Sequence, residues 1–259
     1  MKKFIGAALL FAFVVAPVFA QGAGEPVDLG PVGGGIGNLE PGFPTAIADT
    51  STTPETAWEV GVAGSYITNG TVFEEALLQV NYGILENLQL RGTWAWVIGE
   101  GRVAGNGDTD VGLLWAFLAE DDMMPSMGIE ISGKAPTGDG FTGYNGTAIG
   151  VLTKTFGEAR VHLNAGYTTI GDDRPGIRND ADYFAIGMDY PLLDNLVLVA
   201  DGFSLEAPVE GGDRIEMVEA GVRAAVTDVD IISFGVATSV GNGNITPDFT
   251  ATLGYQRAL

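Results

Sequence analysis

The sequence predicts an all-β protein, a transmembrane antiparallel up-and-down β-barrel of about twelve strands. Three observations favour this fold: an N-terminal secretory signal, about a dozen segments that alternate apolar and polar residues, and an alternation of long and short connections between them. A period of two is typical of a strand. Because a bilayer requires a partner for every backbone N–H and C=O, only helices and closed barrels cross it.

Residues 1–20 predict a cleaved signal peptide. Lys2 and Lys3 supply the charged start, residues 4–15 the apolar run, and Val18 and Ala20 the small residues of a cleavage site. The apolar run is too short for a membrane helix, which needs roughly 20 residues. We therefore expect export, with the outer membrane of a Gram-negative bacterium as the destination.

Residues 21–55 differ from the rest because they are rich in Gly and Pro and show little periodicity. We expect them to form a periplasmic lead-in. The run GGGIG at 33–37 has the composition of a nucleotide-binding loop, but that motif needs a strand before it and a helix after it. Pro31 and Pro41 flank the run instead, so a phosphate site is not predicted.

Residues 56–259 are expected to form the barrel, in one domain. The predicted strands are 56–66, 71–83, 87–99, 108–118, 126–134, 146–155, 159–169, 182–190, 195–204, 214–226, 229–240 and 247–259. Most are close to the ~9–11 residues that a tilted membrane strand requires. Segments 126–134 and 195–204 are the weakest, since Val197 and Val199 obscure which face of the latter points inward. Ten strands therefore remain an alternative.

The connections support the barrel independently. Those after the second, sixth, eighth and tenth strands are tight, whereas those after the third, fifth, seventh and ninth are longer and rich in Gly, Asp and Arg. Such an alternation is typical of outer-membrane barrels, whose periplasmic turns are short and whose outer loops are long.

One face of each strand is apolar and is predicted to contact lipid, for example Trp94, Trp96 and Ile98 in segment 87–99. The reverse faces carry polar residues that are predicted to line the lumen. The predicted pore-lining residues are Glu59, Arg91, Asp110, Glu130, Lys134, Lys154, Arg160, His162, Asn164, Asp189, Asp201, Glu219, Arg223 and Asp248. Charges of both signs inside a membrane protein need water or a partner.

The formal net charge of −21 excludes nucleic acid as a partner, because phosphate binding needs clustered Lys and Arg. On the predicted inner face the acids outnumber the bases. The acids are Glu59, Glu75, Asp110, Glu130, Asp189, Asp201, Glu219 and Asp248, and the bases are Arg91, Lys134, Lys154, Arg160 and Arg223. This excess predicts a modest preference for cations.

Catalysis and metal binding find little support in the sequence. His162 is the only histidine, so a Ser-His-Asp arrangement would depend on it; we interpret it as a hydrogen-bonded side chain of the lumen wall. Asp108 and Asp110 lie in the run NGDTD, which lacks the EF-hand spacing. We predict no enzyme, no metal site and no cofactor.

Residues 129–171 resemble the middle of the outer-membrane transporter family of the MetA-pathway of phenol degradation. The resemblance rests on a Gly-Lys-x-Pro-Thr-Gly loop, a Phe-Gly turn and a strand with His-x-Asn-x-Gly-Tyr. The matching residues are Lys134, Pro136, Thr137, Gly138, Phe156, Gly157, His162, Asn164, Gly166 and Tyr167. The resemblance implies an outer-membrane channel for small solutes, with aromatic compounds as one candidate class.

The leading hypothesis is therefore a twelve-stranded barrel that gives passive passage to small solutes. Its expected partners are outer-membrane lipid, lipopolysaccharide, the barrel-assembly machinery and the solutes. The alternative is a closed structural or surface-interaction barrel, filled by its own side chains or by residues 21–55. A third, an embedded enzyme, would depend on His162.

Overall fold

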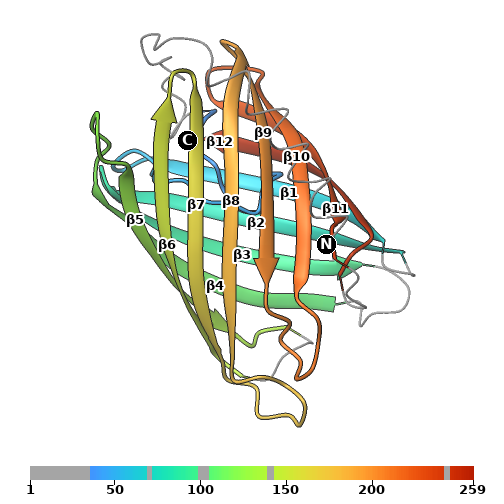
Figure 1. Cartoon of the computed structure of the whole chain (residues 1–259). Helices are drawn as coiled ribbons and strands as arrows, with labels where there is room; N and C mark the ends of the chain where they lie inside the picture. The colour runs from blue at the N-terminus through green and yellow to red at the C-terminus, as the bar shows by residue number, and fades with distance from the viewer. Residues whose placement is uncertain (1–35, 69–71, 99–104, 139–142, 242–245) are drawn as a thin grey trace.

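The computed structural model describes residues 36–68, 72–98, 105–138, 143–241 and 246–259; the predicted signal peptide and residues 21–35 lie outside this set. The described residues form twelve antiparallel strands that close into one barrel (Figure 1). The strands are β1 (Trp58–Thr68), β2 (Val72–Leu85), β3 (Leu88–Ile98), β4 (Gly105–Leu118), β5 (Ser126–Ala135), β6 (Asn145–Phe156), β7 (Ala159–Ile170), β8 (Asp180–Leu193), β9 (Leu196–Leu205), β10 (Ile215–Ala225), β11 (Asp230–Ser239) and β12 (Phe249–Ala258). Within the described ranges, no helix is long and apolar enough to cross a membrane.

The barrel closes between its first and last strands. Every strand pairs with its neighbours in the sequence, and β1 pairs with β12 from Glu59 opposite Ala258 to Thr68 opposite Phe249. The backbone N–H of Leu259 adds a 2.8 Å hydrogen bond to the carbonyl oxygen of Trp58. Closure leaves no strand edge with unpaired backbone groups, which is the condition for crossing a bilayer.

The predicted fold class is confirmed, and so is the strand count of twelve. Both weak segments form strands, β5 and β9, and each pairs along its length with two neighbours. Val197 and Val199 share a face with Asp201, which lies opposite Gly187 in β8. That face points into the barrel, where both valines are almost completely buried.

The described connections differ at the two ends of the barrel. At one end, which we call the short-turn end, β2–β3, β6–β7 and β8–β9 are joined by two residues each. Gly157 in the β6–β7 turn has φ of +65°, a conformation that side-chain-bearing residues rarely adopt. At the opposite end, the long-loop end, the connections 171–179 and 206–214 are nine residues long.

The outer face of the barrel is apolar and rich in aromatic residues. Trp58, Trp94, Trp115, Phe234 and Leu253 are all about half exposed there. Apolar surface of this extent is not stable against water, and an outward apolar band with aromatic residues is typical of transmembrane barrels. Trp94, which the sequence predicts to contact lipid, is one of these exposed residues.

Candidate functional site: the lumen and its plug

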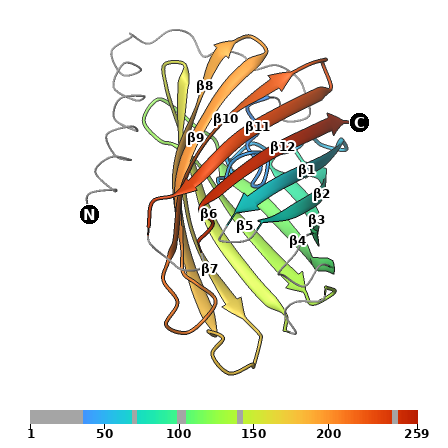
Figure 2. The ribbon, with the colours of Figure 1, turned by 90° about the vertical axis from the view of Figure 1, so that its right-hand side faces the viewer.

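Residues 36–53, which we call the plug, fold inside the barrel (Figure 2, blue segment). Ile36, Leu39, Phe43 and Ile47 are no more than 1% exposed. The segment leaves the lumen at the short-turn end, where the hydroxyl of Thr52 donates a 2.7 Å hydrogen bond to the carbonyl oxygen of Glu86. From the sequence, we interpret residues 21–55 as a periplasmic lead-in or, in the closed-barrel alternative, as a segment that fills the barrel; the described part from residue 36 to residue 53 lies within the lumen.

Glu40 anchors one side of the plug to β2 and β3. Its carboxylate accepts hydrogen bonds from the side-chain amides of Gln79 at 2.5 Å, Asn81 at 3.0 Å and Gln89 at 2.9 Å. Arg91 lies 3.6 Å from the same carboxylate and also pairs with Glu130 on β5. A buried carboxylate needs such partners, because burial without them costs several kcal/mol.

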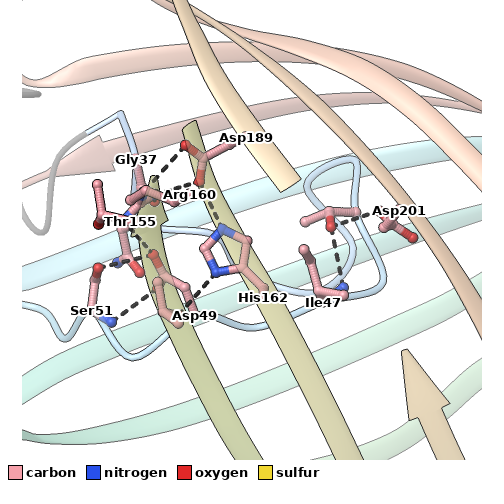
Figure 3. A network of polar contacts seen from close by, with 12 residues as sticks. Gly37, Ile47, Asp49, Ser51, Thr155, Arg160, His162, Asp189 and Asp201 are labelled. Atoms are coloured by element: carbon pink, nitrogen blue, oxygen red, sulfur yellow. Dashed lines mark hydrogen bonds and ion pairs between the residues drawn. The ribbon is translucent and has the colours of Figure 1, made fainter. Parts of the chain in front are cut away.

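Asp49 anchors the other side through Arg160 on β7 (Figure 3). The guanidinium lies 3.1 Å from Asp49 and 2.6 Å from Asp189 on β8, and it also donates to the carbonyl oxygen of Gly37. One arginine thus holds both ends of the plug and a lumen-wall carboxylate. Asp49 and Asp189 are fully buried, so each depends on this cation.

His162 joins the same network from β7. Its Nδ1 lies 2.9 Å from the Thr153 hydroxyl and its Nε2 lies 2.8 Å from Asp189. Hydroxyl, imidazole and carboxylate in this order are also the arrangement of a hydrolase triad. Here His162 and Asp189 are 0% exposed and Thr153 only 4%. A nucleophile must meet its substrate, so this burial favours a structural role for the three residues.

Arg223 on β10 holds the start of the plug and is the largest fully buried side chain among the described residues. It donates one hydrogen bond to the carbonyl oxygen of Asn38 and another, 3.1 Å long, to Gln256 on β12. Gln256 in turn donates to Glu59 on β1 at 2.8 Å. This chain of contacts places the predicted pore residues Glu59 and Arg223 in the wall beside the plug rather than on an open water path.

An apolar part of the lumen wall packs against the plug. Ile36, Leu39 and Ile47 form one buried cluster with Ala185, Val197, Val199 and Ile231. Inward-facing valines would be unfavourable in a water-filled pore. The plug therefore explains why β9 carries apolar residues on both faces.

Inward-facing glycines provide the space that the plug occupies. A Cβ atom on Gly61 would lie 2.6 Å from the ring of Phe43, and one on Gly254 would lie 2.9 Å from it. Cβ atoms added to Gly221 and Gly235 would lie too close to Pro44, and a Cβ atom added to Gly187 would lie 2.4 Å from Ile47. Such separations are not tolerated in packed proteins, so the wall and the plug are complementary in shape.

Several predicted pore residues lie beyond the plug, toward the long-loop end. Asp110 accepts a 3.1 Å hydrogen bond from Ser132 and lies opposite Lys134 in the β4–β5 register. These two charged residues and Glu219 on β10 are only partly buried. Asp248 precedes β12, is exposed, and lies at the rim rather than along the wall. Asp110, Lys134 and Glu219 thus retain some exposure inside the barrel.

Lys154 is not in the lumen, and this prediction was wrong. It lies opposite Val161 in the β6–β7 register, and opposite residues in an antiparallel pair share a face. Since His162 points inward, its neighbour Val161 and therefore Lys154 point outward. At the short-turn end Lys154 donates to the Asp121 carbonyl oxygen and pairs with Glu120 at 3.0 Å. Burial alone would raise the pKa of Glu120, but hydrogen bonds from Thr155 and Lys154 outweigh it and lower that pKa.

The remaining predicted pore residues all lie at the level of the plug. Asn164 binds the backbone of Ala48. Asp201, labelled in Figure 3, accepts a 2.8 Å hydrogen bond from the Thr45 hydroxyl. The sequence reasoning missed their partners in the plug, above all Glu40 and Asp49. One signal in the sequence could have indicated them. Glu40 and Asp49 are acidic residues in a Gly/Pro-rich segment, and Arg91 and Arg160 on the predicted inner face are bases that need acidic partners.

No protein-family model and no curated protein matches this sequence. The fold is similar to the crystal structure of an outer membrane channel from Pseudomonas putida F1, with a TM-score of 0.62 and 15% identity over 85% of this chain and 100% of that chain. It is also similar to NanC porin (TM-score 0.59, 10% identity, 77% of this chain and 100% of that chain). KdgM porin gives a TM-score of 0.53 at 11% identity, over 76% of this chain and 98% of that chain.

The fold is that of an outer-membrane β-barrel. This likeness confirms the fold that the sequence resemblance in residues 129–171 implies. At these identities it shows the fold alone, and the lumen has to be understood from its own residues.

Proposed function

We propose that the chain is an outer-membrane channel through which small solutes pass passively. A signal peptide at residues 1–20 directs export and is cleaved, the barrel-assembly machinery inserts the strands, and lipid and lipopolysaccharide surround the apolar outer face. The proposal assigns passage to the lumen, with no catalytic step, metal or cofactor.

This proposal rests on the charged residues that face the lumen in its long-loop half. Asp110, Lys134 and Glu219 point inward and are only partly buried. Charged side chains of both signs that retain exposure inside a barrel are typical of a water-containing path. The likeness to a Pseudomonas channel and to two porins supports the same function.

A second candidate is a closed barrel with a structural or surface-interaction role. The plug favours it, because its anchors on β2, β7 and β10 reach three different parts of the wall. Under the first proposal the plug narrows the short-turn half of a conducting channel. Under the second it seals that half.

Single-channel conductance in a planar bilayer separates the two candidates. The refolded mature protein is compared with a variant that lacks residues 22–50, under a KCl gradient. We expect discrete steps from the mature protein and larger steps from the variant. A silent mature protein together with a conducting variant would instead establish the sealed barrel.

The preferred solutes are proposed to be small and neutral or cationic. Glu219 and Asp201 face the lumen next to the plug, and the nearest inward base on β10, Arg223, is engaged by Asn38 and Gln256. Small aromatic compounds are the first to screen, because the family that residues 129–171 resemble is named for phenol degradation. A reversal potential on the anion side would contradict the cation preference.

A further inference from the structure

Two carboxylates face each other across β9 and β10, directly above the plug. Asp201 lies opposite Glu219 in the antiparallel register, and both point into the lumen. Side chains at such positions have Cβ atoms about 4.5–5.5 Å apart, and like charges there are unfavourable. The pair therefore needs a positive partner or a shared proton.

The two oxygens of Asp201 are in different surroundings. Oδ2 accepts hydrogen bonds from the Thr45 hydroxyl at 2.8 Å and from the Ala46 backbone N–H at 3.4 Å. Oδ1 is buried and has no hydrogen-bond partner among the described residues. An unpaired buried carboxylate oxygen is costly, so this atom marks a position where a donor belongs.

Glu219 retains some exposure, whereas Asp201 is 1% exposed. The part of the chain that the structure describes offers Glu219 no hydrogen bond or ion pair. The next inward residue but one on its strand, Arg223, binds Asn38 and Gln256 instead. Glu219 is thus a partly exposed carboxylate beside a second, buried carboxylate.

An apolar and aromatic wall rises from this pair toward the long-loop end. Phe203 and Met217 are the next inward residues on β9 and β10 and lie opposite each other. Tyr183 on β8 packs with Phe203 against the cluster that contains Ile47. An aromatic wall next to carboxylates matches the two parts of an amphipathic cation, because aromatic faces attract cations as well as apolar groups.

We infer that Asp201 and Glu219 bind the ammonium group of an organic cation whose apolar or aromatic body lies against Tyr183, Phe203 and Met217. The described residues contain no group of three or more His, Cys, Asp or Glu that could hold a metal ion, which favours an ammonium over a divalent metal. The inference rests on the proposed channel function, since it names the class of solute that the lumen retains.

Binding of phenethylammonium to the folded barrel in detergent tests the site by isothermal titration calorimetry. The neutral alcohol 2-phenylethanol has nearly the same shape and lacks the charge. We expect saturable binding of phenethylammonium and at least about tenfold weaker binding of the alcohol, because hydrogen bonds to charged groups contribute more than neutral ones.

The variants Glu219→Gln and Asp201→Asn are each expected to weaken phenethylammonium binding about ten- to hundredfold. Glu219→Gln removes no contact that the fold uses, so it remains informative if Asp201→Asn fails to refold. Glu216→Gln is the matched control, because it removes the same charge from β10 at a position that points to the opposite face. Its affinity should equal that of the unaltered barrel.

Three results would overturn the inference. These are equal affinity for the amine and the alcohol, unchanged affinity in Glu219→Gln, and no saturable binding at all, which would mean that the carboxylates share only a proton. The conductance experiment gives an independent answer about the channel. Binding without conductance would retain the site and reject the channel, whereas conductance without binding would do the reverse.

Discussion

Asn164 on β7 binds the backbone of Ala48 in both directions. The backbone N–H of Ala48 donates a 2.8 Å hydrogen bond to the side-chain oxygen of Asn164, and the Asn164 amide donates a 2.9 Å hydrogen bond to the carbonyl oxygen of Ala48. The Asn164 side chain thereby makes the two hydrogen bonds to the Ala48 backbone that a neighbouring strand would otherwise make. All four groups are buried, so neither hydrogen bond competes with water.

We expect Asn164→Ala to loosen the plug. The change leaves the N–H and the carbonyl oxygen of Ala48 buried without partners, which costs about 1–3 kcal/mol. The chain contains no cysteine, so an Ala48→Cys background provides a single thiol whose maleimide labelling reports exposure of the plug. Labelling should be about five- to 150-fold faster in the Asn164→Ala variant.

Thr168→Ala is the matched control for that experiment. Thr168 lies on the same strand and hydrogen-bonds Thr147, away from the plug. Its labelling rate should equal that of the background protein. Equal rates in all three proteins would mean that Asn164 does not hold the plug.

Gly61→Leu is expected to displace the part of the plug around Phe43 and to increase conductance. The new side chain would overlap the ring of Phe43, and such overpacking costs about 1–3 kcal/mol. Gly92→Leu adds the same side chain where nothing lies within 4 Å of the added Cβ, so its conductance should match that of the unaltered protein. Larger steps from both variants, or from neither, would contradict this role of Gly61.

The sequence was sufficient to predict the barrel because strand alternation is a local property. Apolar residues at every second position identify a strand and its lipid face without any knowledge of the partners, and the observed strands of β1 and β7 end within two residues of the predicted ones. Glu59, Arg160, His162 and Asn164 lie on the inner face of these two strands, where they contact the plug or the wall beside it.

The plug could not be predicted in this way because its contacts connect residues far apart in the sequence. Thr45 and Asp201 are 156 positions apart, and nothing local in residues 36–53 indicates β9 as a partner. The error at Lys154 has the same origin. Val151 on β6 packs inward in a cluster with Ala48, so an apolar residue of β6 lies on the inner face. Lys154, three positions later, is therefore on the opposite, outer face of the strand.

The two lysines of β5 and β6 should differ in their effect on ion selectivity. Lys134 points into the long-loop half of the lumen, so Lys134→Gln removes a positive charge from the path and should shift the reversal potential further to the cation side. Lys154→Gln removes a charge from the outer face and should leave the reversal potential unchanged. Equal shifts in both variants would place Lys154 back in the lumen.

His162→Ala should destabilise the barrel. The truncation leaves the Thr153 hydroxyl and one oxygen of Asp189 without their imidazole partner in a fully buried site, at a cost of about 1–3 kcal/mol. The urea midpoint of refolding in detergent measures the loss, and His162→Gln should recover part of it because an amide retains a donor and an acceptor. A hydrolytic activity that disappears in His162→Ala at unchanged stability would contradict the structural role.

Phe43 touches both sides of the seam where the barrel closes. Gly61 belongs to β1 and Gly254 to β12, so the place that receives the ring is complete only when the last strand has joined the first. Residue 254 leaves the ribosome long after residue 43. The plug therefore acquires its full set of neighbours in the final step of assembly, and a barrel that closes without it would leave this part of the lumen to water.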